Sequence, residues 1–297
     1  MPGDLWHLYS AQWHNDSAHA ETMPRKGIHV VNVKSVWAVY FSPTGNTRKI
    51  VSRIANVIAE ELLVKCRSFD FTLPESRESD LSFSADDLVV LGTPVIAGRV
   101  PNVLLNHLGT LRGNGAVAVP VVSFGNRAYD DALIELRDIL ERDGFHTMAA
   151  AAFVGEHSFS YRLAGGRPDE ADMAVASDFA RRVATKVRDV TDAHSLTPVA
   201  VKGVPYPYRG YFQPLDAEGN PIDIRKVKPV TGPECNDCKL CAKVCPMGSI
   251  SYGNVREYTG ICIKCGACIK KCPQHARYYD DSNYLYHKQE LEETLTR

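Results

Sequence analysis

Residues 36–47 of the 297-residue chain spell VWAVYFSPTGNT, an apolar run followed by a turn rich in Ser, Thr and Gly. The run from Val36 to Phe41 has the length of a strand, and it stops where the turn begins. Apolar residues then recur at helical spacing from Ile50 to Leu62. The stretch therefore predicts a strand, a loop and a helix in direct succession.

The same alternation continues to about residue 190. Further strands are expected at 65–71, 88–92, 116–124 and 147–154, and helices at 101–111, 130–143 and 168–190. Strands that are apolar throughout and alternate with helices are typical of a parallel sheet covered on both faces. We expect an α/β fold with a doubly wound, parallel, five-stranded sheet.

Composition divides the rest of the chain. Residues 1–32 show no clear period, and we expect a disordered extension ahead of an α/β domain at 33–195. The stretch from Thr197 to Pro233 holds seven prolines, so 196–232 is expected to be a linker or wrapping segment. A small cysteine domain is expected at 233–276, followed by a tail at 277–297 whose last residues, from Gln289, are helical and exposed.

Bulk properties exclude several classes of protein. The formal net charge of −1 gives no whole-chain electrostatic case for nucleic-acid binding. The longest apolar run, 115–124, is too short to span a bilayer and contains Pro120. The N-terminus lacks the basic-then-apolar pattern of an export signal. We expect a cytoplasmic protein without membrane insertion.

Eight of the nine cysteines form an internal repeat, CNDCKLCAKVCP at 235–246 and CIKCGACIKKCP at 262–273. Both copies have the spacing C-x2-C-x2-C-x3-C-P. Three closely spaced thiolates wrap one set of irons, whereas the fourth cysteine points away and reaches the other cluster. The spacing therefore predicts two [4Fe–4S] clusters, one held by Cys235, Cys238, Cys241 and Cys272, and the second by Cys262, Cys265, Cys268 and Cys245.

A zinc ribbon is the alternative interpretation of these cysteines, because two Cys-x-x-Cys pairs make a tetrahedral zinc site. That site leaves the third cysteine of each repeat unexplained. The region resembles bacterial-type two-[4Fe–4S] ferredoxins, and the resemblance implies a small α+β domain that carries low-potential electrons singly. The ninth cysteine, Cys66, lies in an expected strand, which favours a buried, inert thiol.

The turn at 42–47 opens the first helix. A helix N-terminus offers unpaired N–H groups and the positive end of a dipole, so it can hold a phosphate. Ser42, Thr44 and Thr47 add hydroxyl donors, and Gly45 lets the backbone approach the anion. The loop contains no Lys and is no Walker P-loop. A simple N-cap turn remains the alternative.

Two further loops, 93–99 and 123–129, follow strands that line the same crevice. At this point residues 36–190 resemble a flavodoxin, whose phosphate-loop motif matches Ser42 to Thr47. The resemblance implies FMN, with its ring between the second and third loops. The cofactor contacts that it implies are Ser42, Thr44, Gly45, Asn46, Thr47, Thr93, Pro94, Val95, Ile96, Gly98, Arg99, Ser123, Phe124, Gly125, Asn126 and Tyr129.

The chain departs from flavodoxins in one respect. Flavodoxins often place an aromatic side chain on each side of the ring, but here the second loop offers Ile96, and Tyr129 is the expected ring contact. His157 either approaches the flavin or bonds backbone in its loop. Arg99 and Arg127 either pair with a flavin anion or a partner's carboxylates, or are surface charges.

From about residue 36 to residue 274 the chain resembles flavodoxin–ferredoxin fusion proteins of anaerobes. The resemblance implies an electron carrier that relays low-potential electrons between two [4Fe–4S] clusters and FMN, serving a redox partner protein or a small-molecule electron acceptor. One alternative is an FMN-dependent reductase of a small molecule or quinone, fed by the clusters. Another is a sensor or binding module whose flavin site has decayed.

Overall fold

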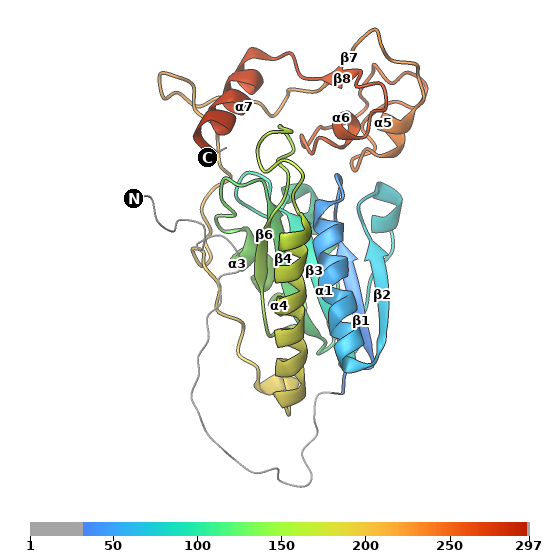
Figure 1. Cartoon of the computed structure of the whole chain (residues 1–297), viewed down its shortest axis with the longest axis vertical. Coiled ribbons are helices and arrows are strands. Elements are labelled where there is room, and N and C mark those ends of the chain that lie inside the picture. Colours follow the sequence, from blue (N-terminus) through green and yellow to red (C-terminus); the bar gives the residue numbers. More distant parts are fainter. Residues whose placement is uncertain (1–31, 296–297) are drawn as a thin grey trace.

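A computed structural model describes residues 32–295, and the expectation of a disordered N-terminal extension lies outside this range but for its last residue. The described chain forms two parts (Figure 1). A sheet flanked by helices makes the larger part. The cysteine region lies across one end of that sheet, the end where the strands finish.

The sheet contains β1 (Ser35–Tyr40), β2 (Lys65–Asp70), β3 (Asp87–Pro94) and β4 (Val117–Phe124), and its fifth position is shared by β5 (His146–Thr147) and β6 (Ala151–Val154). All neighbours are parallel, in the order β2-β1-β3-β4 and then β5 or β6. This is the doubly wound order of flavodoxin-like folds. The expectation of a five-stranded parallel sheet is confirmed.

The last strand differs from the expected continuous run at 147–154. His146 pairs with Val117, but Ala151 pairs with Val121, so the register shifts by one residue between β5 and β6. An extra residue on one strand of a pair interrupts the ladder, as in a β-bulge. The interruption leaves the two short strands on the same side of β4.

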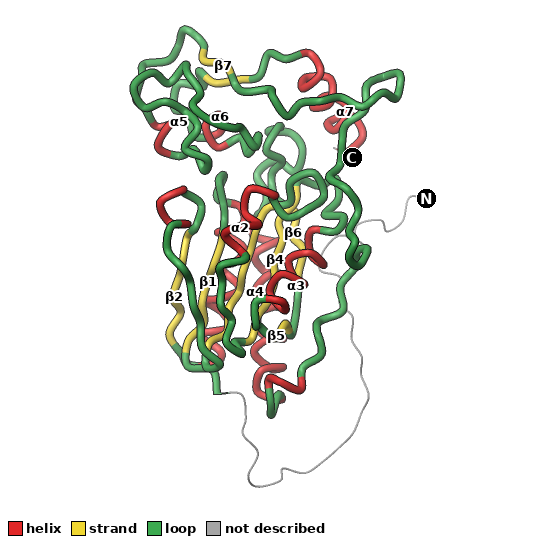
Figure 2. The backbone as a smooth tube through the Cα atoms, turned by 180° about the vertical axis from the view of Figure 1, so that it is seen from behind, coloured by secondary structure: helices red, strands yellow, loops and turns green. Residues whose placement is uncertain are grey.

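Helices cover both faces of the sheet. The helices α1 (Asn46–Leu62) and α4 (Glu170–Asp189) pack on the face that includes Ala38 and Tyr40. On the other face, with Val39 and Phe41, lie α2 (Leu105–Leu108) and α3 (Ala132–Arg142) (Figure 2). Successive strand residues thus point to opposite faces. The helix expected at 101–111 is shorter, a 3-10 turn at Asn102–Leu104 followed by α2, which ends at Leu108.

The expectation that Cys66 is a buried thiol is wrong. Cys66 lies in β2, and the cysteine is exposed. β2 is the edge strand of the sheet order, and its side chains are almost all exposed.

Residues 196–232 wrap along the α/β domain. Asp131, whose side chain is fully buried, accepts the N–H groups of Val204 and Arg209, both at 2.9 Å. The Tyr211 hydroxyl donates to the Val100 carbonyl at 2.9 Å. Hydrogen bonding to the Arg209 guanidinium holds the pKa of Asp131 well below its usual range. The segment is therefore tied to the α/β domain by an ionised carboxylate.

The cysteine region contains the short helices α5 (Leu240–Lys243) and α6 (Ala267–Lys270) and an antiparallel pair, β7 (Val230–Thr231) and β8 (Arg277–Tyr278). The terminal helix α7 (Ser282–Leu295) begins earlier than the helix expected from residue 289. It is not simply exposed, because Tyr284, His287 and Leu291 are buried. None of the helices within residues 32–295 is long and apolar enough to cross a membrane.

Candidate iron–sulfur and flavin sites

The two cysteine repeats adopt the same loop conformation. Each residue of the second copy follows its counterpart by 27 positions, as Cys262 follows Cys235. Residues with positive φ also occur at equivalent positions of the two copies. Asp237 and Lys264 have φ values of 58° and 55°, and the next pair, at 239 and 266, has 62° and 74°. Such alternation turns backbone N–H groups toward the inside of a loop, and the Lys264 N–H lies 3.4 Å from the Cys262 sulfur.

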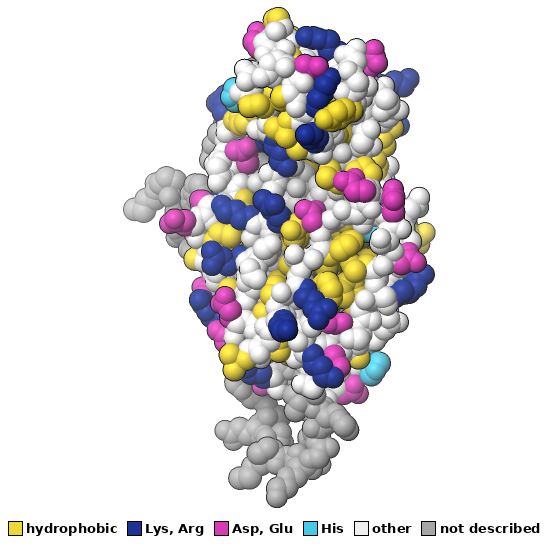
Figure 3. Space-filling view, turned by 90° about the vertical axis from the view of Figure 1, so that its right-hand side faces the viewer, with side chains coloured by type: hydrophobic (Ala, Val, Ile, Leu, Met, Phe, Trp, Pro, Cys, Tyr) yellow, Lys and Arg dark blue, Asp and Glu magenta, His cyan; other side chains and the backbone are white. Residues whose placement is uncertain are grey.

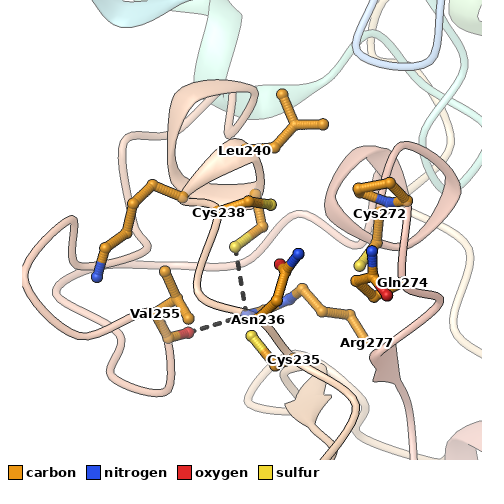
Figure 4. A pocket seen from close by; sticks show the side chains of 11 residues that line it. Cys235, Asn236, Cys238, Leu240, Val255, Cys272, Gln274 and Arg277 are labelled. Carbon is orange, nitrogen blue, oxygen red and sulfur yellow. Dashed lines mark hydrogen bonds between the residues drawn. The ribbon is translucent and has the colours of Figure 1, made fainter.

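The folded chain gathers the eight cysteines around two hollows. One is lined by Cys235, Cys238, Cys241 and Cys272 (Figure 4). The other is lined by Cys245, Cys262, Cys265 and Cys268. In each case the fourth cysteine comes from the opposite repeat. These are the two sets that the spacing predicts, and we call the spaces the first and second cysteine hollows.

Cations lie buried beside both hollows. Arg277 is 2% exposed, and its guanidinium donates to the Val255 carbonyl at 2.9 Å and lies 3.7 Å from the Cys241 sulfur (Figure 4). Lys264 is 9% exposed and donates to the Cys262 carbonyl at 3.0 Å. Metal-bound cysteines are thiolates, so these cations offset the negative charge that ligation creates. The residues present therefore fit anionic iron–sulfur groups.

Sequence reasoning missed both cations. Lys264 stands between two ligands, where its charge is an available signal. Arg277 gives none, because its counterpart in the first repeat is Ile250 and it lies beyond the second Cys-Pro pair.

Within the described residues, no three Cys, His, Asp or Glu side chains are placed to hold a single metal ion.

The hollows differ in their distance from the α/β domain. The loop of the second hollow lies against that domain, since a Cβ on Gly266 would stand 2.5 Å from the Ser158 carbonyl oxygen. Ile263 packs against the apolar cluster that includes Phe41 and Phe71. The first hollow faces outward, and Cys238 is exposed.

Lys270 of α6 fastens the two parts together. Its side chain is 10% exposed, pairs with Glu156, and donates to the carbonyls of His157 and Ser160 at 2.7 and 2.9 Å. Burial lowers the pKa of Lys270, and Glu156 opposes that shift. A second contact runs from the Arg77 guanidinium to the Pro246 carbonyl at 2.6 Å.

The loop at 42–47 opens α1 as expected. Gly45 is the N-cap, with φ of 103°, and makes no side-chain capping bond. The Ser42 hydroxyl accepts the Arg48 N–H at 2.9 Å. The first N–H groups of α1, those of Asn46 and Thr47, have no partner within the helix. A 17-residue helix with free leading N–H groups fits an anion.

Two of the expected donors are engaged elsewhere. The Thr47 and Ser123 hydroxyls bond each other at 2.7 Å, which joins the first and third loops. The Asn46 side chain donates to the Glu156 carbonyl at 3.2 Å. Thr44 is half-buried, so its hydroxyl is the loop's best remaining side-chain donor.

The second loop is a tight turn in which Ile96 and Arg99 exchange backbone hydrogen bonds. The N–H of Val95 donates to the Ser123 carbonyl at 2.8 Å, so the second and third loops touch. The Arg99 guanidinium is bound by both Glu135 oxygens, at 2.8 and 2.6 Å, rather than directed to a cofactor. Further along the same edge, Pro94 ends β3 and the Gly98 carbonyl accepts the Asp131 N–H at 3.0 Å.

Thr93 carries an orphaned group. Its hydroxyl is buried with no partner within residues 32–295. A buried polar group without a partner is costly, so this position is one where a ligand atom fits.

Three residues of the third loop, Gly125, Asn126 and Tyr129, make close contacts. Tyr129 meets Phe124 edge-on, with ring centres 5.4 Å apart, and burial raises its pKa. The Asn126 amide donates to the Leu295 carbonyl at 2.9 Å, which ties α7 to the loop. A Cβ on Gly125 would overlap the His157 ring, so the two residues lie in close contact.

His157 bonds backbone, in line with the second of its two interpretations. Its Nδ1 accepts the Phe159 N–H at 3.1 Å. Burial lowers the pKa of His157 to about 3, and the charges of Lys270, His287 and Arg127 act in the same direction. Arg127 itself pairs with Asp130, so its charge is not free.

A third hollow, of about 220 Å³, lies between the domains and α7. Its walls carry aromatic and basic side chains: Phe159, Tyr161, Tyr278, Tyr279, Tyr284, Lys270, Arg277 and Lys288. It shares Arg277 with the first cysteine hollow and Tyr279 with the second.

Comparison with known families matches residues 234–284 to the 4Fe-4S dicluster domain. The chain joins a flavodoxin-like α/β domain to a 4Fe-4S dicluster domain. The order of the sheet strands identifies the first part, and the family match identifies the second. No curated protein matches the chain.

Solved structures similar to the flavodoxin-like part include a flavodoxin from the domain Archaea (17% identity, 52% of this chain, 98% of that chain, TM-score 0.37). Flavodoxin 2 from Bacillus cereus is 20% identical over 52% of this chain and 99% of its own, with a TM-score of 0.37. Rubredoxin oxygen:oxidoreductase from the anaerobe Desulfovibrio gigas is 16% identical over 54% of this chain, and the match spans 37% of its length (TM-score 0.40).

Proposed function

We propose that this electron-transfer iron–sulfur flavoprotein holds two [4Fe–4S] clusters and FMN and relays low-potential electrons between them. When bound, each cluster exchanges one electron and FMN exchanges one or two. The observation that carries the proposal is the seating of the second cysteine hollow on the sheet edge where the three loops meet, through Gly266, Ile263 and Lys270.

Different residues of the chain hold the clusters, bind the flavin phosphate and face the redox partner. The eight cysteines hold the clusters, with Arg277 and Lys264 offsetting their charge. The leading N–H groups of α1 and the Thr44 hydroxyl bind the FMN phosphate. The outward first hollow, with exposed Cys238, serves a redox partner protein or a small-molecule acceptor. Basic and acidic side chains lie among hydrophobic ones on the surface of the dicluster end (Figure 3). We place the protein in the cytoplasm, where thiols stay reduced.

The test removes the Lys270 contacts that hold the dicluster domain against the flavodoxin-like domain. In Lys270→Met, the ion pair and two carbonyl contacts disappear, so reduction of bound flavin after the clusters are reduced should slow at least tenfold in anaerobic stopped-flow. The matched control is Lys243→Met, since exposed Lys243 occupies the same position of α5, 27 residues earlier. Unchanged flavin reduction in Lys270→Met, with both cofactors retained, contradicts the relay.

The third hollow favours a second candidate, reduction of a small molecule or quinone. Its volume of about 220 Å³ and its aromatic walls suit a planar organic molecule. Steady anaerobic turnover of a quinone, competed by molecules that fill this hollow, supports this candidate over the carrier.

A further inference from the structure

The second cysteine hollow has polar neighbours that the first lacks, although the repeats are alike. The counterpart of Tyr279 is Tyr252, which is 59% exposed and takes no part in the first hollow. Tyr279 instead lines the second hollow, with its hydroxyl 3.9 Å from the Cys262 sulfur. The asymmetry lies on the side of the second hollow that faces α7.

The terminal helix adds a second tyrosine. The ring of Tyr284 stacks on that of Tyr279, with centres 3.8 Å apart and planes 24° apart, and lies 4.6 Å from Phe159. Burial, and then the charges of Cys262 and Cys268, raise the pKa of Tyr284. Tyr284 itself lines the third hollow, and Tyr279, on which it stacks, lines both the third hollow and the second, so the Tyr284 ring adjoins the wall of the second hollow through Tyr279.

The Tyr284 hydroxyl has no hydrogen-bond partner within the described chain, and the side chain is 1% exposed. A buried hydroxyl without a partner is destabilising, and such groups in native proteins have an explanation. An iron–sulfur centre supplies one, because its sulfurs accept hydrogen bonds.

We infer that the Tyr284 hydroxyl donates a hydrogen bond to a sulfur of the centre held by Cys245, Cys262, Cys265 and Cys268, and that this bond raises the reduction potential of that centre alone. The inference rests on the proposed two-cluster function. A hydrogen bond to sulfur stabilises the reduced form, which carries one more negative charge. Tyr284 is thus a positioning residue that makes the inner site the favoured place for a single electron.

Arg277 does not produce this difference. Its guanidinium lies 3.7 Å from the Cys241 sulfur of the first hollow, and interaction with Cys268 of the second contributes to raising its pKa. Because one cation acts on both centres, its removal shifts both potentials, whereas removal of the Tyr284 hydroxyl shifts one.

The test is Tyr284→Phe in the fully loaded chain. The change keeps the ring stack and removes one oxygen. In an anaerobic redox titration followed by EPR, one of two midpoint potentials should fall, by up to the tenfold change in equilibrium constant that corresponds to about 59 mV. Tyr286→Phe is the matched control, since Tyr286 lies on the same helix and is 40% exposed.

Two further variants identify the centre. Tyr279→Phe should shift the same potential in the same direction. In a Cys245→Ala background, Tyr284→Phe should leave the remaining centre unchanged. Two loaded centres whose potentials are the same in Tyr284→Phe and in the parent overturn the inference. Iron and sulfide for one centre only overturn the two-cluster proposal instead.

Discussion

In the flavodoxin-like domain, apolar side chains are fully buried on both faces of the sheet, such as Val36 and Val90 on one face and Val39 and Leu91 on the other. In the dicluster domain, the buried apolar residues described between 229 and 281 are few: Pro229, Pro246, Ile250, Val255, Ala267, Ala276 and Tyr279. Its interior holds cysteines and the cations Arg277 and Lys264 instead. Burial of apolar surface is the dominant favourable term in folding, so the comparison indicates that one domain folds by burial and the other by ligation.

The largest expected effect is that of removing the iron, which should unfold the dicluster domain and leave the flavodoxin-like domain folded. After chelation under reducing conditions, residues 229–281 should lose their hydrogen-exchange protection, while residues 35–189 keep theirs, because metal-ligand free energy is folding free energy in a small domain. Before chelation, analysis should find about eight irons and eight sulfides per chain, and one FMN. Four of each, or stoichiometric zinc, contradicts the two-cluster assignment.

Within the dicluster domain, replacing the fourth cysteine of one repeat should perturb the centre that is held mainly by the other repeat. Cys245→Ala should spare the centre at Cys235, Cys238, Cys241 and Cys272 and should perturb the other one, since Cys245 lines the second hollow. Cys272→Ala should do the reverse. Anaerobic EPR of the two variants compares the centres. If Cys245→Ala harms the same centre as Cys235→Ala, each repeat binds its own cluster.

The sequence alone predicted those features of the structure that are encoded within a short stretch of residues. Apolar runs predicted β1, β3 and β4, and the C-x2-C-x2-C-x3-C spacing predicted the cysteine sets, because both signals lie within a dozen residues. Contacts over long separations left no such signal. Lys270 meets Glu156 across 114 positions, and Arg77 meets Pro246 across 169.

Candidate site residues that pair with other parts of the protein also lacked a local signal. Arg99 was a candidate for binding an anion, but its guanidinium pairs with Glu135 of α3. Cys66 was expected to be buried because it lies in a strand, whereas the sheet order places that strand at the edge. Side-chain partners and strand order are set by tertiary packing, which a local pattern does not contain.

The flavodoxin-like domain should respond to acid through His157, where it meets the dicluster domain. The group has a pKa of about 3 when folded and about 6.5 when unfolded. The unfolded chain therefore binds a proton that the folded chain does not between these values, so stability falls as pH drops from 6.5 toward 3. At pH 5 the loss is about 2 kcal/mol, from about 1.4 kcal/mol per pH unit.

His157→Asn keeps an acceptor for the Phe159 N–H and does not titrate, so its urea midpoint should fall less between pH 7 and pH 5. Lys270, His287 and Arg127 still face the position in this variant. His194→Asn, at an exposed site, should behave like the parent. Equal pH slopes for His157→Asn and the parent contradict the assignment.

An effect of similar size is expected at the phosphate loop, where the flavodoxin-like domain itself depends on a ligand. Thr44→Val keeps the shape of the side chain and removes the hydroxyl that the rest of the loop leaves uncommitted. A hydrogen bond to a charged group contributes roughly 1.5–3 kcal/mol, so the Kd for FMN should rise about tenfold or more. Riboflavin has no phosphate, and its Kd should not change.

Isothermal titration of the flavin-free chain measures both constants. Thr185→Val is the matched control, because its hydroxyl bonds the Arg181 carbonyl on the exposed side of α4. Thr47→Val sharpens the comparison further. Its hydroxyl bonds Ser123 inside the fold, so that change should lower stability rather than act through the phosphate alone. Equal FMN affinity in Thr44→Val and the parent, with riboflavin bound as tightly as FMN, means that the N-terminus of α1 is an ordinary helix cap and the phosphate lies elsewhere.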